Sequence, residues 1–124
     1  MTDDDSSQTA PARADVREVR EVDVHEAATL AEQSWLMLDV REHDEWAEGH
    51  MVGATHVPLG ELDPRAIPTD VSVVAVCRSG NRSSTAAAVL LEAGHEVVNM
   101  VGGMKAWQQA GLPVTTDAGK PGTI

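Results

Sequence analysis

The residue best suited to covalent chemistry in this 124-residue chain is Cys77, its only cysteine. A polar loop follows it directly, composed of Arg78, Ser79, Gly80, Asn81, Arg82 and Ser83. Glycine and asparagine tolerate left-handed backbone angles, so such a loop can curl and point successive N–H groups inward as an anion-binding nest. The pattern predicts a nucleophilic thiolate that the loop itself stabilises, with loop N–H groups and side chains as the substrate-binding groups.

The charges around this cysteine have one sign. Between Val71 and Leu91 the only charged side chains are Arg78 and Arg82, although the whole chain carries a net charge of −11. A helix that follows the loop adds its N-terminal dipole. Helix N-termini with nearby arginines lower a cysteine pKa from about 8.5 to roughly 3.5–7.5. Cys77 therefore needs no histidine as a base, and the two arginines are candidates to hold an anionic substrate.

The surrounding sequence must place this loop, and it alternates between strand-like and helix-like segments. The uncharged run from Val71 to Val76 is the strongest strand, and Trp35 to Val40 is a second buried strand. Shorter strands are predicted at 20–24, 55–59 and 96–100, and helices at 23–33, 42–49, 83–93 and 102–111. This alternation predicts an α/β fold with an open, mostly parallel sheet and helices on both faces. Ligands bind at the carboxyl ends of the strands in such sheets, where Cys77 lies.

Composition restricts the class of protein. The length suits one domain, and the negative charge argues against nucleic acid and anionic membranes as partners. A single cysteine excludes an intramolecular disulfide, and the scattered histidines predict no metal site. We expect no cofactor and a cytoplasmic location. We also expect a disordered acidic N-terminal tail at residues 1–15, a folded domain at 16–116 and a flexible C-terminal tail at 117–124.

Three stretches of the sequence together resemble the rhodanese, or sulfurtransferase, family. The loop from Cys77 to Ser83 looks like its active-site loop, and Gly102, Gly103 and Trp107 match a late Gly-Gly-x-x-x-Trp element. The stretch from Leu36 to Leu62 matches family positions at Asp39, Arg41, Glu45, Trp46, Gly49, His50, Gly53, Ala54, His56 and Pro58. The resemblance is to a single-domain rhodanese and covers about residues 19–114.

The resemblance implies a five-stranded parallel sheet and a persulfide on Cys77. It implies transfer of a sulfane sulfur from a donor such as thiosulfate to a thiophilic acceptor, which is cyanide, a thiol or a partner protein. The partners are then a small-molecule donor and acceptor, with a sulfur-accepting protein as a further option. Asp39, Arg41, Gly102 and Gly103 are interpreted as structural motif residues. His50, His56, Trp46 and Trp107 are likewise interpreted as packing residues.

Two other functions stay open on the sequence alone. Cysteine phosphatases and arsenate reductases use a related loop, and the phosphatases place an arginine after a five-residue spacer. Here the spacer between Cys77 and Arg82 has four residues, which makes a smaller nest that suits one sulfur atom better than a tetrahedral phosphate. The second alternative is a regulatory or persulfide-relay module that binds partners.

Overall fold

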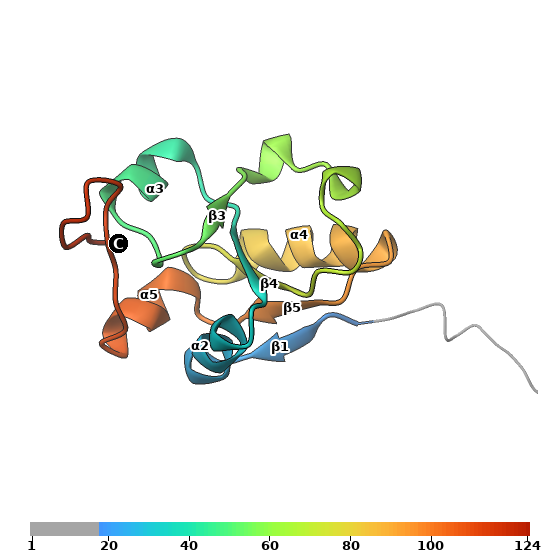
Figure 1. The fold of residues 1–124 in the computed structure, drawn as a ribbon, viewed down its shortest axis with the longest axis horizontal. Helices are drawn as coiled ribbons and strands as arrows, with labels where there is room; N and C mark the ends of the chain where they lie inside the picture. The colour runs from blue at the N-terminus through green and yellow to red at the C-terminus, as the bar shows by residue number, and fades with distance from the viewer. Residues whose placement is uncertain (1–17) are drawn as a thin grey trace, which may run out of the picture.

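The computed structural model describes residues 18–124, and its centre is a five-stranded parallel sheet (Figure 1). The strands lie in the order β1-β5-β4-β2-β3, and all four neighbouring pairs are parallel. Their bounds are β1 (Arg20–Val22), β2 (Leu36–Asp39), β3 (Thr55–His56), β4 (Val73–Val76) and β5 (Val97–Met100). The predicted fold is confirmed. The tail expected at residues 1–15 and the start of the domain at Val16 lie outside the described residues.

Helices cover both faces of this sheet. They are α2 (Val24–Glu32), α3 (His43–Glu48), α4 (Asn81–Glu92) and α5 (Gly103–Gln109), with 3-10 turns η1 (Leu59–Glu61) and η2 (Pro64–Ala66). Strand residues alternate between the faces: Val74 and Val76 pack with α2 and α5, whereas Val73 and Ala75 pack with α4. Figure 1 shows α4 on the opposite side of the sheet from α2 and α5. Cys77 belongs to the cluster on the α4 side.

The ends of the helices follow from local sequence. The carboxylate of Asp23 accepts a hydrogen bond from the backbone N–H of Glu26, which caps α2 as predicted. Helix α4 begins at Asn81, two residues earlier than the sequence pattern suggests. The reason is Gly80, whose φ of 106° turns the loop directly into the helix.

The C-terminal segment, which the sequence predicts as a flexible tail at residues 117–124, makes backbone hydrogen bonds in the structure. Thr123 donates its backbone N–H to the carbonyl of Glu48 at the end of α3, and Gly122 donates to the carbonyl of Val114, which follows α5. Ile124 packs against the core cluster on the α2 and α5 side. Gly49 makes this approach possible, since a Cβ there would lie 2.6 Å from the backbone N and O of Thr123. These contacts are made mainly by backbone groups, so the polar composition of the segment gave no signal for them.

Across residues 18–124, no helix has the length and apolar character that crossing a membrane requires.

Candidate active site

The carboxyl ends of three adjacent strands form the candidate active site. Strand β4 is flanked by β2 and β5, and Cys77 follows directly on its last residue. Strand β2 ends at Asp39, and β5 leads into Gly102 and Gly103. The sheet therefore brings together the cysteine loop, the Asp-x-Arg pair and the Gly-Gly element, which the sequence separates by tens of residues.

The sulfur of Cys77 lies inside its loop and accepts two hydrogen bonds. The Gly80 backbone N lies 3.0 Å from Sγ, and the Ser83 hydroxyl oxygen lies 3.2 Å from it. Burial of the thiol raises its pKa, since the residue is only 1% exposed. The hydrogen bonds from the Ser83 side chain and from the backbone N–H groups of Ser83, Gly80 and Ser79 outweigh burial, so the pKa of Cys77 lies below its usual value. The site favours a thiolate, as a nucleophile requires.

The N–H groups of the loop turn inward because its carbonyl groups are held outward by α5. The backbone N of Met104 lies 2.8 Å from the carbonyl oxygen of Cys77, and that of Lys105 lies 3.0 Å from that of Arg78. In a trans peptide the N–H points opposite to the C=O, so these bonds turn the N–H groups of Arg78 and Ser79 away from α5, and the Ser79 N–H is one of those that lower the pKa of Cys77. Helix α5 therefore shapes the nest with its own first-turn N–H groups.

Asn99 of β5 is a second support of the loop, and sequence reasoning missed it. Its Nδ2 donates to the carbonyl of Gly80 at 3.2 Å, and its Oδ1 lies 2.6 Å from the Ser83 hydroxyl. The side chain is 1% exposed. The available signal was a lone amide in the apolar strand Val97–Met100, where a buried polar group requires partners.

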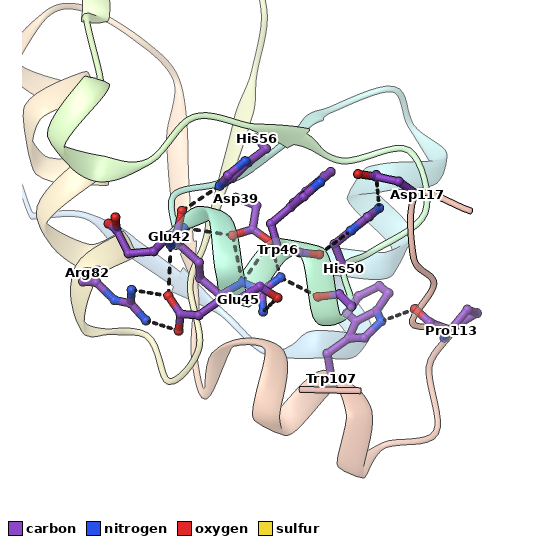
Figure 2. A network of polar contacts seen from close by, with 12 residues as sticks. Asp39, Glu42, Glu45, Trp46, His50, His56, Arg82, Trp107, Pro113 and Asp117 are labelled. Atoms are coloured by element: carbon purple, nitrogen blue, oxygen red, sulfur yellow. Dashed lines mark hydrogen bonds and ion pairs between the residues drawn. The ribbon is translucent and has the colours of Figure 1, made fainter. Parts of the chain in front are cut away.

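The predicted loop residues differ in exposure. Gly80 and Ser83 are buried beside the sulfur, whereas the side chains of Arg78, Ser79 and Asn81 are exposed. Arg82 is partly buried and already has a partner: its two terminal nitrogens lie 2.7 and 2.9 Å from the carboxylate oxygens of Glu45 in α3 (Figure 2). Arg78 is therefore the arginine whose charge the described contacts leave available to a substrate, and Arg82 fixes the loop to α3.

We expect this ion pair to make stability depend on pH. The Arg82 guanidinium lowers the pKa of Glu45 from its usual 4.5 to about 2. The pair then contributes fully above about pH 4.5, where the unfolded chain also carries the charge, and its contribution is lost as the pH falls toward 2. At pH 7 the free energy of unfolding of wild type should be higher than that of Glu45→Gln by about 1 kcal/mol, a small difference because the ion pair is partly exposed. This difference in unfolding free energy should become smaller below pH 4.5. Urea unfolding at several pH values measures this difference.

Glu48→Gln is the matched control, because it removes an exposed carboxylate from the same helix without touching Arg82. If the difference in unfolding free energy between wild type and Glu45→Gln stays constant from pH 7 to pH 2.5, the ion pair with Arg82 is not the source of the pH dependence.

Gly103 is the point of closest approach between α5 and the loop. A Cβ at this position would lie 2.5 Å from the carbonyl oxygens of both Cys77 and Arg78, and its φ is +61°. We expect Gly103→Ala to lower the free energy of unfolding by about 2–4 kcal/mol, from backbone overlap and left-handed strain together. It should also raise the pKa of Cys77, since the carbonyls that orient the nest are displaced. Urea unfolding and the pH dependence of thiol alkylation measure the two effects.

Gly111→Ala is the control for this substitution. Gly111 has a similar positive φ of +79°, but nothing lies within 4 Å of a Cβ built there. Gly111→Ala should lower the free energy of unfolding by only about 1–2 kcal/mol, the cost of placing alanine in a left-handed conformation. The pKa of Cys77 should be unchanged. Equal effects of the two alanines would show that contact with the loop is unimportant.

The Asp-x-Arg motif forms a fully buried ion pair at the carboxyl end of β2. Asp39 and Arg41 are each 1% exposed, and Arg41 Nη2 lies 2.8 Å from the Asp39 carboxylate. The same nitrogen donates to the carbonyl of Gly49 at 2.8 Å. The pair therefore connects the end of β2 to the residue that follows α3.

Trp46 lies between the two histidines of the motif (Figure 2). Its ring stacks on His50 with centroids 3.6 Å apart and on His56 at 4.7 Å. His50 bonds to the carbonyl of Trp46 at 2.9 Å, and His56 to that of Arg41 at 2.7 Å. These contacts hold α3 against the end of β3.

A cavity of about 260 Å³ adjoins the loop. It is lined by Arg41, Asp44, Glu45, Glu48, Arg78 and Ile124. Cys77 lies outside this lining. Three carboxylates share the cavity with the two arginines, so the surroundings of Arg78 are of mixed charge.

The fold and the site together define an α/β domain that holds one buried cysteine in a loop of backbone N–H donors, at the end of a central parallel strand. The profile of the rhodanese-like domain matches residues 23–110, and the chain belongs to this family. It is 39% identical over 87 residues to a protein named sulfurtransferase from Allochromatium vinosum, covering 68% of this chain and 81% of that one. The resemblance stated from the sequence is thereby confirmed.

Two further relatives bear on the extent of the match. A putative sulfur carrier protein of Bacillus subtilis, YrkF, is 38% identical over 80 residues, which cover 62% of this chain but 43% of YrkF. The chain thus matches less than half of that relative. The crystal structure of a rhodanese-related protein from Thermoplasma volcanium superposes with a TM-score of 0.74 at 27% identity, covering 79% of this chain and 99% of that one.

Proposed function

We propose that this protein transfers sulfane sulfur through a persulfide on Cys77. The observation that supports this most directly is the position of Sγ, which is buried and faces inward-directed donors from Gly80 and Ser83. Membership of a family with sulfurtransferase relatives supports the same reaction class. Each histidine of the motif has one ring nitrogen within hydrogen-bond distance of a backbone carbonyl, and the proposed reaction assigns no proton transfer to either of them.

The chemistry suits a thiolate without a base. The Cys77 thiolate attacks the outer sulfur of thiosulfate, an S–S bond forms to Sγ, and the S–S bond of the donor breaks. Sulfite leaves with the electron pair as a stable anion, so no general acid is required. The negative charge now lies on the outer sulfur of the persulfide, where loop N–H groups stabilise it as an oxyanion hole does. An acceptor thiolate or cyanide then attacks that sulfur, and Sγ leaves with the electron pair.

The donor and acceptor are proposals on the same chemical grounds. Arg78 is exposed and is the candidate to bind an anionic donor. The acceptor is a small thiol, cyanide or a cysteine of a partner protein.

Loading with thiosulfate tests the proposal. The protein is mixed with thiosulfate, separated from the excess and weighed by intact mass spectrometry without reductant. The expected result is a gain of one sulfur atom that disappears when cyanide or a thiol is added. No gain at any pH would overturn the proposal, and turnover of an aryl phosphate would favour the phosphatase alternative.

A further inference from the structure

Three buried polar groups form a line that leads away from the sulfur. The Ser83 hydroxyl oxygen lies 3.2 Å from Cys77 Sγ and 2.6 Å from Oδ1 of Asn99. All three residues are at most 1% exposed, so no bulk water can substitute for a missing partner. A hydroxyl has one proton to donate, and here two neighbours compete for it.

The orientation of the Asn99 amide decides what its oxygen can do. Its Nδ2 faces the carbonyl of Gly80 at 3.2 Å and the carboxylate of Glu21 at 3.4 Å, which are both acceptors. The amide oxygen therefore faces Ser83, and an amide oxygen can only accept. The Ser83 proton thus lies either on the side of Asn99 or on the side of the sulfur.

The chemical state of Cys77 selects between these two positions. A neutral thiol can donate its S–H to the Ser83 oxygen, whose own proton goes to Asn99, and every group is satisfied. A thiolate takes the Ser83 proton and leaves the Asn99 oxygen without a donor, which is costly in a dry site. In a persulfide, Sγ is neutral and the charge lies on the outer sulfur, so the Ser83 proton returns to Asn99.

We propose that Asn99 is a positioning residue that holds the Ser83 proton whenever Cys77 carries a proton or a sulfur atom, and so disfavours the empty thiolate. The persulfide part rests on the proposed function, whereas the part about thiol and thiolate rests on geometry alone. Asn99 acts through Ser83 and touches no reacting atom in the described contacts.

Other charged groups near the loop also affect the pKa of Cys77, so a variant that tests Asn99 must leave them unchanged. They are Arg78 in the loop, Arg82 of α4 with its partner Glu45 of α3, the Asp39–Arg41 pair below, and Glu21 of β1 beside Asn99. Substitutions at Asn99 and Ser83 leave all of these in place. Gly80 also keeps a donor to its carbonyl, because the Ser84 N–H lies 3.2 Å from it.

Asn99→Leu removes the competing oxygen and keeps the branched shape of the side chain, with the same number of heavy atoms. We expect the pKa of Cys77 to fall by about one pH unit, because the Ser83 proton becomes free for the thiolate. The pH dependence of iodoacetamide alkylation, followed by mass, measures this value. A purely structural role would loosen the loop and raise the pKa, and an unchanged or raised value in a folded variant overturns the proposal. Asn99→Val is the smaller replacement if leucine prevents folding.

The Ser83→Ala background shows whether Asn99 acts through Ser83. Ser83→Ala should raise the pKa of Cys77, and adding Asn99→Leu to it should change nothing further. A persisting effect of Asn99→Leu in this background overturns the proposed route.

Equilibrium loading tests the persulfide part. In a fixed mixture of thiosulfate and sulfite above the thiol pKa, the ratio of loaded to empty protein should fall about tenfold in Asn99→Leu. An unchanged ratio overturns this part. If wild type takes up no sulfur at all, the proposed function fails while the alkylation result still decides the role of Asn99.

Discussion

Replacing Cys77 by serine is expected to abolish sulfur transfer, lowering kcat/KM by about a thousandfold or more. The hydroxyl is not ionised near neutral pH and forms no persulfide, although it keeps the same position beside Gly80 and Ser83. The variant should therefore fold with a melting temperature close to that of wild type. Thiocyanate formation from thiosulfate and cyanide, together with intact mass after loading, measures the loss.

Ser79→Ala is the matched control for this substitution. Ser79 lies in the same loop, but its side chain is exposed and the Cys77 pKa depends on its backbone N–H. Its removal should leave loading within about threefold of wild type, because the N–H remains. Sulfur uptake by Cys77→Ser at the wild-type rate would place the nucleophile elsewhere and contradict the persulfide proposal.

The second large effect is expected at Arg41. Arg41→Met leaves the buried carboxylate of Asp39 without its partner and removes the donor to the carbonyl of Gly49. Breaking one side of a buried ion pair costs about 3–5 kcal/mol, so the variant should unfold at much lower urea than wild type. Equilibrium unfolding measures this loss, which is large against the usual total stability of about 5–15 kcal/mol.

The chain contains its own control for this prediction, a second Asp-x-Arg pair. Arg65 and Asp63 have the same spacing, but their side chains are 90% and 49% exposed. Arg65→Met should leave the unfolding midpoint unchanged, because water solvates both charges. Equal losses at Arg41 and Arg65 would show that burial of the pair is not what makes it important.

Local sequence was sufficient to predict most of the secondary-structure elements and the position of Cys77 at the end of a strand. The apolar run from Val73 to Val76 forms the central strand, Asp23 caps the first described helix, and Gly80 has the positive φ that the loop requires. Each of these depends on neighbouring residues only. The strand–helix alternation also determined the parallel fold, because parallel strands need crossovers of that length. The place of Cys77 at the carboxyl end of a central strand, from which we infer that it is the nucleophile, follows from the same alternation.

Tertiary structure decided which distant groups serve that nucleophile. Strand β5 beside β4 places Asn99 against Ser83, and the approach of α5 at Gly103 holds the carbonyls of the loop. Arg82 is bound by Glu45, which lies 37 residues earlier, so its charge is less available to a donor than the local sequence suggests. The order of strands in the sheet and the close packing of its helices create these contacts. Neither can be predicted from the spacing of residues within one segment. The sequence alone determined that a cysteine follows the central strand in a polar loop, and the fold decided which distant groups contact that loop.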